Sequence, residues 1–198
     1  MTSAQIARLF VAVDPPQEAC EQLAAWARGA VRGMGLHGGR SKVSSARVLD
    51  PGLMHVTLCF LGNRPVAEIA AIEGCLEECA MGVGELSIGT PLWLPPRRPR
   101  ALAVEVRDNP EGGLSALHGA LVEALARASG YEQERRRYRA HVTLARLRAG
   151  PRGALGERVL PPTPALSFTP TSVVLYRSWL SPAGASYEAL ATRTLIPL

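Results

Sequence analysis

A short sequence that begins with histidine occurs twice in this chain. His-Val-Thr-Leu begins at His55 and again at His141, although the chain holds only four histidines. In an extended strand, residues i and i+2 point to the same face, so each copy places an imidazole beside a hydroxyl group. The two hydroxyl groups belong to Thr57 and Thr143. Such a repeat predicts two similar strands that present histidine and threonine to a shared site.

This set of side chains suits the cleavage of a phosphodiester. In-line displacement needs a base for the incoming water and an acid for the departing oxygen, on opposite sides of phosphorus. Histidine, whose ordinary pKa is near ~6.5, can perform either role at neutral pH. Threonine hydroxyls can donate to the non-bridging oxygens, where negative charge builds up. We therefore predict His55 and His141 as an acid–base pair, with Thr57 and Thr143 as phosphate ligands.

Other chemistries fit the sequence less well. The three aspartates, Asp14, Asp50 and Asp108, all lie away from the two motifs, whereas a two-metal phosphodiesterase needs clustered carboxylates and histidines. The cysteines lack the spacing of a zinc site, so no metal is expected. Cys59 shares the face of His55 in strict alternation, but a packed strand cysteine is the preferred interpretation over a nucleophile.

The elements that position the motifs follow from apolar periodicity and from glycine and proline. Strands are predicted over residues 8–13, 53–61, 86–94, 101–107, 140–147, 172–180 and 187–195. Helices are predicted from the Asp14-Pro15-Pro16 start to residue 33, from residue 65 to residue 79, and over residues 112–129. Loops are predicted over residues 36–50 and 148–167.

These elements predict an α+β fold. Each half of the chain contains strands, a helix and one copy of the motif, which indicates a bilobal, pseudo-symmetric protein. We expect two mainly antiparallel sheets that line a central cleft, with helices outside. Asp14 is expected to cap the first helix, Phe60 to anchor its strand in the core with Leu58, and His118 to be structural on its helix. Residues 1–198 are expected to form one bilobal domain.

The charge balance favours an anionic ligand. The formal net charge is +5 and the sequence pI is about 9.4, and nearly all the basic residues are arginines, whose planar fork suits phosphate oxygens. An alternative is that the arginine clusters form a solvated surface. No apolar run is long enough for a membrane span or a secretory signal, so a cytoplasmic location is expected.

Longer runs around the motifs resemble a known family. Leu53–Gly62 (LMHVTLCFLG), Tyr138–Arg146 (YRAHVTLAR), the C-terminal hairpin and the opening RLFVAVDPP resemble the two-histidine phosphoesterase superfamily. Within it, the chain is most similar to the RNA 2′,3′-cyclic phosphodiesterase family, historically named 2′-5′ RNA ligase.

The resemblance implies an activity. It implies hydrolysis of 2′,3′-cyclic phosphate ends of RNA, or of cyclic nucleotides, to a 2′-phosphomonoester, without metal or cofactor. It also implies that His141 activates water and that Arg146 contacts the phosphate. Strict alternation from His141 would place Arg146 on the opposite face, so this role requires the strand to twist, bulge or end near Ala145.

The basic cluster before the second motif is expected to contact the RNA strand through Arg135, Arg136 and Arg137. Two other functions remain open on the same fold. One is a non-catalytic module that binds RNA ends, although a binder has no need for two titratable imidazoles. The other is an RNA ligase that forms 2′-5′ linkages, the reverse of the same transesterification. Joining of RNA halves, or release of phosphomonoester without ATP, would distinguish them.

Overall fold

The structure, a computed structural model, describes residues 5–34, 46–79, 81–108, 112–134, 136–147, 160–182 and 184–196. The helices are α1 (Gln17–Gly33), α2 (Ile69–Glu78) and α3 (Gly113–Ser129), with short 3₁₀ turns at Pro51–Leu53 and Val66–Glu68. The strands are β1 (Ile6–Val13), β2 (Ala46–Val48), β3 (Val56–Pro65), β4 (Leu86–Leu94), β5 (Ala101–Arg107), β6 (His141–Leu147), β7 (Ser167–Phe168), β8 (Ser172–Ser181) and β9 (Gly184–Thr194).

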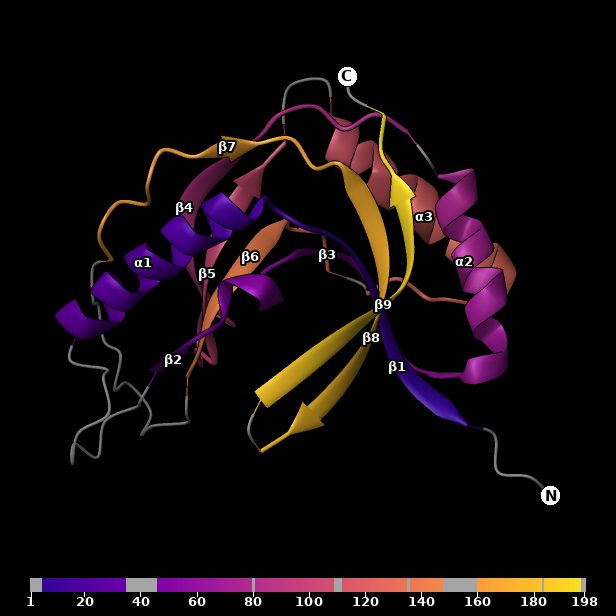
Figure 1. Cartoon of the computed structure of the whole chain (residues 1–198), viewed down its shortest axis with the longest axis horizontal. Helices are drawn as coiled ribbons and strands as arrows, with labels where there is room; N and C mark the ends of the chain where they lie inside the picture. The colour runs from indigo at the N-terminus through magenta and orange to yellow at the C-terminus, as the bar shows by residue number, and fades with distance from the viewer. Residues whose placement is uncertain are drawn as a thin grey trace.

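All strand pairs are antiparallel and follow the order β7-β4-β5-β6-β3-β1-β8-β9, with β2 added to β6. We call β3, β1, β8 and β9 the His55 lobe, and β6, β5, β4, β7 and β2 the His141 lobe. The two lobes lie side by side in Figure 1. The predicted α+β class is confirmed.

Within the described residues, the sheet continues from one lobe to the other through a single strand pair. β3 pairs with β6 only at Val56 and Val142, and both side chains are fully buried. The two expected sheets are therefore continuous through this pair and form one nine-stranded sheet. β3 and β6 form no further pairs, and a pocket lined by residues of both lobes lies beside this one.

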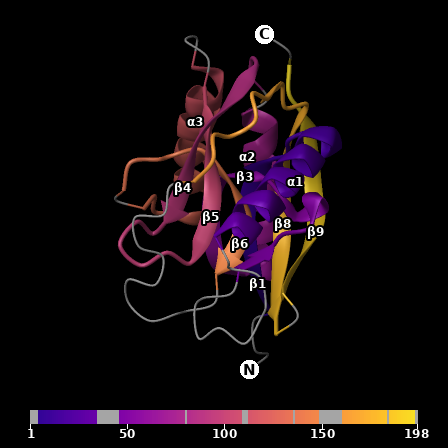
Figure 2. The same cartoon turned by 90° about the vertical axis from the view of Figure 1, so that its left-hand side faces the viewer.

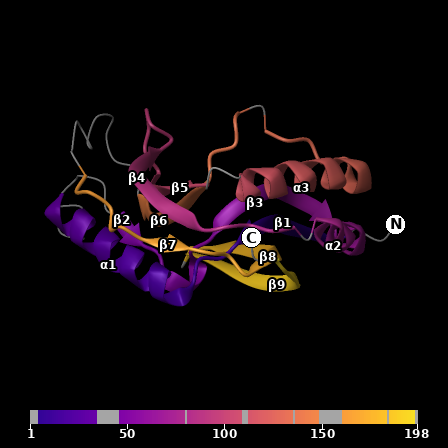
Figure 3. The same cartoon turned by 90° about the horizontal axis from the view of Figure 1, so that it is seen from above.

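The helices cover the lobes unequally. α1 packs against β2 and β6 of the His141 lobe, whereas α3 contacts β3 and α2 contacts β8 and β9 of the His55 lobe. Figure 3 shows α1 on one side of the molecule and the α2–α3 pair on the other, and in the view of Figure 2 α1 faces the viewer, in front of α2. The lobes are not the two halves of the chain, because the C-terminal strands β8 and β9 pair beside β1. The chain returns to its starting lobe.

The beginning of α1 differs from the prediction. The helix begins at Gln17 with Pro16 in the capping position, and no side chain caps it. Asp14 instead accepts a hydrogen bond of 2.5 Å from the Tyr176 hydroxyl on β8. The expected cap was wrong because two prolines separate the carboxylate from the first helical residue. Asp14 thus ties the end of β1 to the neighbouring strand.

The predicted loops are only partly within the described residues. Ala46–Val48 forms β2 rather than loop, because its backbone pairs with β6. Residues 36–45 and 148–159, which include His37, lie outside the described residues. Ser167 begins β7, at the end of the second predicted loop.

Candidate active site

The pair that joins the lobes also brings the two motifs together. Val56 and Val142 face each other in antiparallel strands, and each is flanked by a histidine and a threonine. Continuing that register places His55 nearest Thr143, and Thr57 nearest His141. All four flanking side chains are half-buried. The sheet itself therefore sets the spacing between the two imidazoles.

A central pocket of about 500 Å³ lies at this junction. Among its lining residues are His55, Thr57, His141, Thr143, Arg146 and Tyr187. The structure thus brings together all five residues predicted for catalysis and phosphate binding. Tyr187 is an addition that the sequence analysis missed.

A bulge in each motif strand decides which later residues face this pocket. Thr143 pairs with Ala103 and Ala145 with Leu102, so Leu144 is an extra residue in β6. Leu144 and Ala145 are both fully buried, which reverses the alternation beyond them. Arg146 therefore shares the face of His141. The sequence required a twist, bulge or strand end near Ala145, and a bulge is present.

β3 has the same bulge at the equivalent position. Thr57 pairs with Ala12 and Cys59 with Val11, so Leu58 is the extra residue. Cys59 is fully buried, whereas Phe60 is 42% exposed. The two predictions based on strict alternation were wrong: Phe60 does not anchor the strand in the core, and Cys59 does not share the face of His55. Leu58 is buried as expected.

Both imidazoles are held by the same backbone contact. Nδ1 of His55 lies 3.0 Å from the carbonyl oxygen of Leu53, and Nδ1 of His141 lies 2.8 Å from that of Arg139. Because a carbonyl oxygen can only accept, Nδ1 must donate in each ring. The neutral form of each ring then has its lone pair on Nε2. Both rings are thus prepared to exchange a proton through the same nitrogen.

His55 lies among aromatic rings. The Phe10 ring stacks on it at 4.7 Å, with 29° between the planes, and Tyr187 meets it edge-on at 5.2 Å. Burial lowers the pKa of His55 to about 4; the positive charges of Arg146 and His141 act in the same direction, and the Leu53 carbonyl opposes them. His55 is therefore neutral at pH 7 before an anion binds. Phe10 and Tyr187 come from distant strands, and nothing in the sequence pointed to them.

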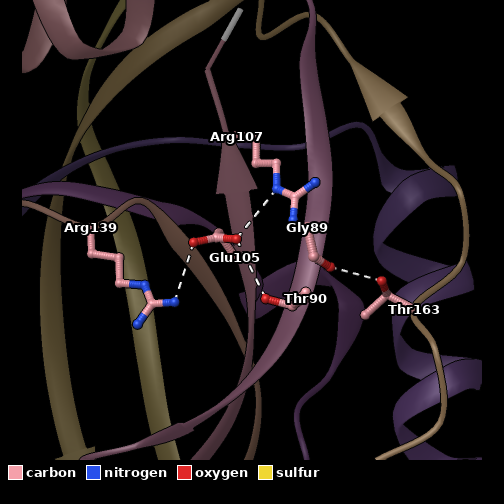
Figure 4. A network of polar contacts seen from close by, with 6 residues as sticks. All are labelled: Gly89, Thr90, Glu105, Arg107, Arg139 and Thr163. Atoms are coloured by element: carbon pink, nitrogen blue, oxygen red, sulfur yellow. Dashed lines mark hydrogen bonds and ion pairs between the residues drawn. The ribbon is translucent and has the colours of Figure 1, made fainter.

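Ionic contacts lie behind His141. Its register partner on β5 is Glu105, which accepts from Arg139 at 3.2 Å and from Nε of Arg107 at 3.4 Å (Figure 4). Burial acts to raise the pKa of Glu105, but the hydrogen bonds from both arginines outweigh it and keep that pKa below its ordinary value. Arg139, whose carbonyl holds His141, is thus itself held by an ion pair.

The neighbouring strand approaches this carboxylate closely. A Cβ atom on Gly89 of β4 would lie 2.8 Å from Oε2 of Glu105, so a larger residue would displace the network in Figure 4. The Gly89 carbonyl also accepts from the Thr163 hydroxyl at 2.7 Å. The glycine therefore allows the ion pairs behind His141 to form.

Tyr138 links the two motifs. Its hydroxyl donates to the carbonyl oxygen of Thr57 at 3.3 Å, and its ring stacks on His118 at 3.9 Å with 9° between the planes. His118 is only 8% exposed, so its predicted position at the edge of the core is confirmed. The segment before the second motif is thereby fixed to the backbone of the first.

Two of the three predicted strand-contacting arginines, Arg136 and Arg137, lie at the edge of the site. Arg136 lines the central pocket with His141. Arg136 and Arg137 also line an adjacent pocket of about 510 Å³, which we call the arginine-side pocket. Both side chains are exposed. Arg135 lies outside the described residues.

Two further findings concern metals and membranes. In the part of the chain that the structure describes, no three His, Cys, Asp or Glu side chains gather as a possible metal site. None of the described helices has the length and apolar character that crossing a membrane requires.

Comparison with known proteins identifies the family. The profile of the 2′-5′ RNA ligase superfamily matches residues 15–179. The RNA 2′,3′-cyclic phosphodiesterase of Archaeoglobus fulgidus is 28% identical over 142 residues, which cover 71% of this chain and 73% of that protein. The RNA 2′,3′-cyclic phosphodiesterase of Bacillus subtilis is 34% identical over 102 residues, which cover 50% and 54% of the two chains.

Solved structures share the fold. E. coli LigT complexed with 3′-AMP matches with a TM-score of 0.76 and 24% identity over 96% of this chain and 99% of that one. The protein TT0787 of Thermus thermophilus matches with a TM-score of 0.75 and 24% identity over 95% and 97%. The family match and the two relatives named RNA 2′,3′-cyclic phosphodiesterase define a phosphoesterase, an enzyme that hydrolyses phosphodiester bonds. The chain belongs to the 2′-5′ RNA ligase superfamily.

Proposed function

We propose that this enzyme hydrolyses 2′,3′-cyclic phosphates at RNA ends, or in cyclic nucleotides, to 2′-phosphomonoesters without a metal ion. The observation that carries the proposal is the central pocket, which is lined by two histidines held by the same backbone contact. The relatives from Archaeoglobus fulgidus and Bacillus subtilis, both named RNA 2′,3′-cyclic phosphodiesterase, support the choice of substrate.

The reaction is an in-line displacement at phosphorus. Nε2 of His141 removes a proton from water, whose oxygen bonds to phosphorus as the bond to the 3′ oxygen breaks. Nε2 of His55 donates a proton to that 3′ oxygen. The products are a free 3′ hydroxyl and a 2′-phosphomonoester. Both motif histidines are then required once in each turnover.

This assignment makes proton uptake part of substrate binding. Burial lowers the pKa of His55 to about 4, so at neutral pH this imidazole gains its proton only when the anionic substrate binds. The anionic phosphate stabilises the charged imidazole and raises its pKa. Calorimetry of adenosine 2′-phosphate binding in buffers of different ionisation enthalpy should register this proton.

Thr57, Thr143 and Arg146 bind the phosphate. Their hydroxyl and guanidinium groups donate to the non-bridging oxygens, where charge increases in the transition state. The bulge at Leu144 supports this role, because it turns Arg146 to the pocket face. Arg136 and Arg137, together with Arg135, contact the backbone of the RNA strand beyond the reacting nucleotide.

The test uses a cyclic-phosphate-ended oligonucleotide with the purified protein, in EDTA and without added nucleotide. The expected product carries a 2′-phosphate, seen as a shifted band that phosphatase removes. Activity lost in EDTA and restored by a divalent cation would overturn the metal-free mechanism. Tight binding without turnover would indicate the binding module, and joining of two RNA halves would indicate the ligase.

A further inference from the structure

Phe10 on β1 belongs to a cluster of four rings at the first motif. Its ring stacks on His55 at 4.7 Å with 29° between the planes, and on Tyr176 at 5.1 Å with 23°. It meets Tyr187 edge-on at 5.1 Å. Phe10 is only 4% exposed and does not line the central pocket. Any effect of this ring on the reacting phosphate is therefore exerted through His55.

The far side of the cluster is anchored by a carboxylate. Tyr176 is the register partner of Phe10 on β8, and its hydroxyl donates to Asp14 at 2.5 Å. Asp14 follows the last residue of β1, so one strand carries both the Phe10 ring and the group that fixes its neighbour. The position of the Phe10 ring is thus set by two paired strands.

Ionisable groups reach His55 from several elements, and most of them are positive. His141 and Arg146 on β6 disfavour its charged form, as does burial. The other ionisable side chains that line the central pocket, or a second pocket of about 530 Å³ beside His55, are Arg8, Arg47, Asp50, Arg100, Arg136 and Tyr187. In the part of the chain that the structure describes, no carboxylate forms an ion pair with His55. The imidazolium therefore forms in largely positive surroundings.

An aromatic face can stabilise such a cation without bringing a charge of its own. The ring quadrupole attracts a cation that lies over the face within about 6 Å of the centroid, and the attraction is stronger where water is excluded. The 4.7 Å between the Phe10 and His55 centroids lies within this range. The neutral imidazole lacks this attraction, so the Phe10 ring favours the charged form.

We propose that the face of Phe10 stabilises the imidazolium of His55 in the substrate complex, and that Tyr176 and Asp14 hold the ring in place for it. Phe10 is then a positioning residue for the general acid. This inference rests on the proposed function, because His55 carries a proton to the 3′ oxygen only in that reaction. The proton comes from solvent as the anion binds and leaves with the 3′ hydroxyl, so Phe10 itself exchanges none.

The experiment measures the pKa of His55 by NMR in the complex with adenosine 2′-phosphate. His55→Asn and His141→Asn assign the imidazole resonances. Phe10→Leu keeps an apolar side chain but has no π-face, so the pKa of His55 should fall by about 0.4 to 1.5. Because the acid must be protonated, the basic limb of the kcat profile for adenosine 2′,3′-cyclic phosphate should move to lower pH by the same amount.

A fluorinated ring tests the same point with little change in packing. Fluorine withdraws electrons from the ring face, so 3,5-difluorophenylalanine at position 10 should lower the pKa of His55 in the same direction by a smaller amount. The matched control is the same amino acid at position 168. Phe168 is 5% exposed and lines none of the three pockets described, so this change should leave the pKa at the wild-type value.

Two results would overturn the proposal. One is an unchanged pKa of His55 in both position-10 proteins, even with a lower kcat, because a ring that only packs lowers kcat without moving the basic limb. The other is an equal fall in the pKa of His141, since weaker anion binding would lower both. Circular dichroism establishes that each protein is folded.

Failure of the proposed function has a separate readout. Absence of adenosine 2′,3′-cyclic phosphate hydrolysis by the wild-type protein would reject that function. A fall in the pKa of His55 in the same adenosine 2′-phosphate titrations would still establish that Phe10 supports the charge.

Discussion

His55 and His141 make the same backbone contact but lie in different surroundings. His55 packs against the rings of Phe10 and Tyr187. Behind His141, Arg139 is held by an ion pair with Glu105 that is partly open to solvent. The structure thus duplicates the strand, the bulge and the imidazole contact, but it does not duplicate the electrostatic environment.

The difference shows what each part of the chain determines. The HVTL repeat occurs in both β3 and β6, and each copy carries a bulge directly after its threonine. The environment comes from the strand beside each motif strand, which is β1 for His55 and β5 for His141. A pair of similar motifs can therefore place one imidazole among aromatic rings and the other beside a strand that carries ion pairs.

The largest expected effect comes from removing either imidazole. His55→Ala and His141→Ala should each lower kcat by about 10²–10⁴-fold, which is typical for loss of a general acid or base. Single-turnover hydrolysis of a cyclic-phosphate-ended oligonucleotide measures it, with circular dichroism to check folding. Near wild-type turnover in either variant would contradict the assignment of the two motif histidines as an acid–base pair.

The buried environment of His55 predicts a dependence of stability on pH. Its folded pKa of about 4 lies below the ordinary 6.5, so between these values the unfolded chain binds more protons. The free energy of unfolding should therefore fall by up to roughly 3 kcal/mol as the pH drops from 6.5 to 4.

Urea unfolding at a series of pH values measures this dependence, and His55→Asn is the comparison. The variant lacks the titrating imidazole, so it should lose that part of the slope. An unchanged slope in His55→Asn would mean that burial does not set the protonation of this histidine.

The third prediction separates phosphate binding from strand binding. Arg146→Ala should lower kcat/KM by about 10- to 100-fold for a cyclic mononucleotide and for an oligonucleotide alike, because both carry the reacting phosphate. Arg136→Gln with Arg137→Gln should raise KM several-fold for the oligonucleotide only, and should flatten its salt dependence. A similar loss on the mononucleotide would place these arginines in the chemical site.

Much of the fold was predictable from local signals. β4 and β5 begin and end at the predicted residues, because the proline-rich turn Pro95–Arg100 separates two apolar runs. The helix boundaries were also close, since glycines at residues 33 and 130 end α1 and α3. Proline restricts its own φ, and glycine tolerates the backbone conformations at which helices end, so both act locally.

The rest depends on contacts that local sequence does not encode. Each bulge arises where a motif strand pairs with its neighbour, so alternation alone misplaced Phe60 and Cys59. In the sequence, the sign of each bulge is a pair of adjacent apolar residues, Leu58-Cys59 in β3 and Leu144-Ala145 in β6. A strand that is buried on both faces would contain the same kind of pair. The rings beside His55 come from β1 and β9, which no local pattern connects to β3.

The smallest expected effect concerns the ionic side of the comparison. Glu105→Gln removes the charge that holds Arg139 but keeps a group of similar shape. Because the ion pair is partly exposed, its loss should cost about 0.2–1 kcal/mol, which corresponds to a decrease in kcat/KM of roughly 1.4- to 5-fold at low salt. High salt screens the same attraction in the wild-type protein, so the difference between variant and wild type should shrink towards 1 M salt. Kinetics at both salt concentrations measure this. A loss that persists at 1 M salt, or that exceeds the loss in Arg146→Ala, would show that Glu105 acts on His141 by more than a screened charge. The ionic surroundings of His141 would then affect catalysis more strongly than their exposure to solvent indicates.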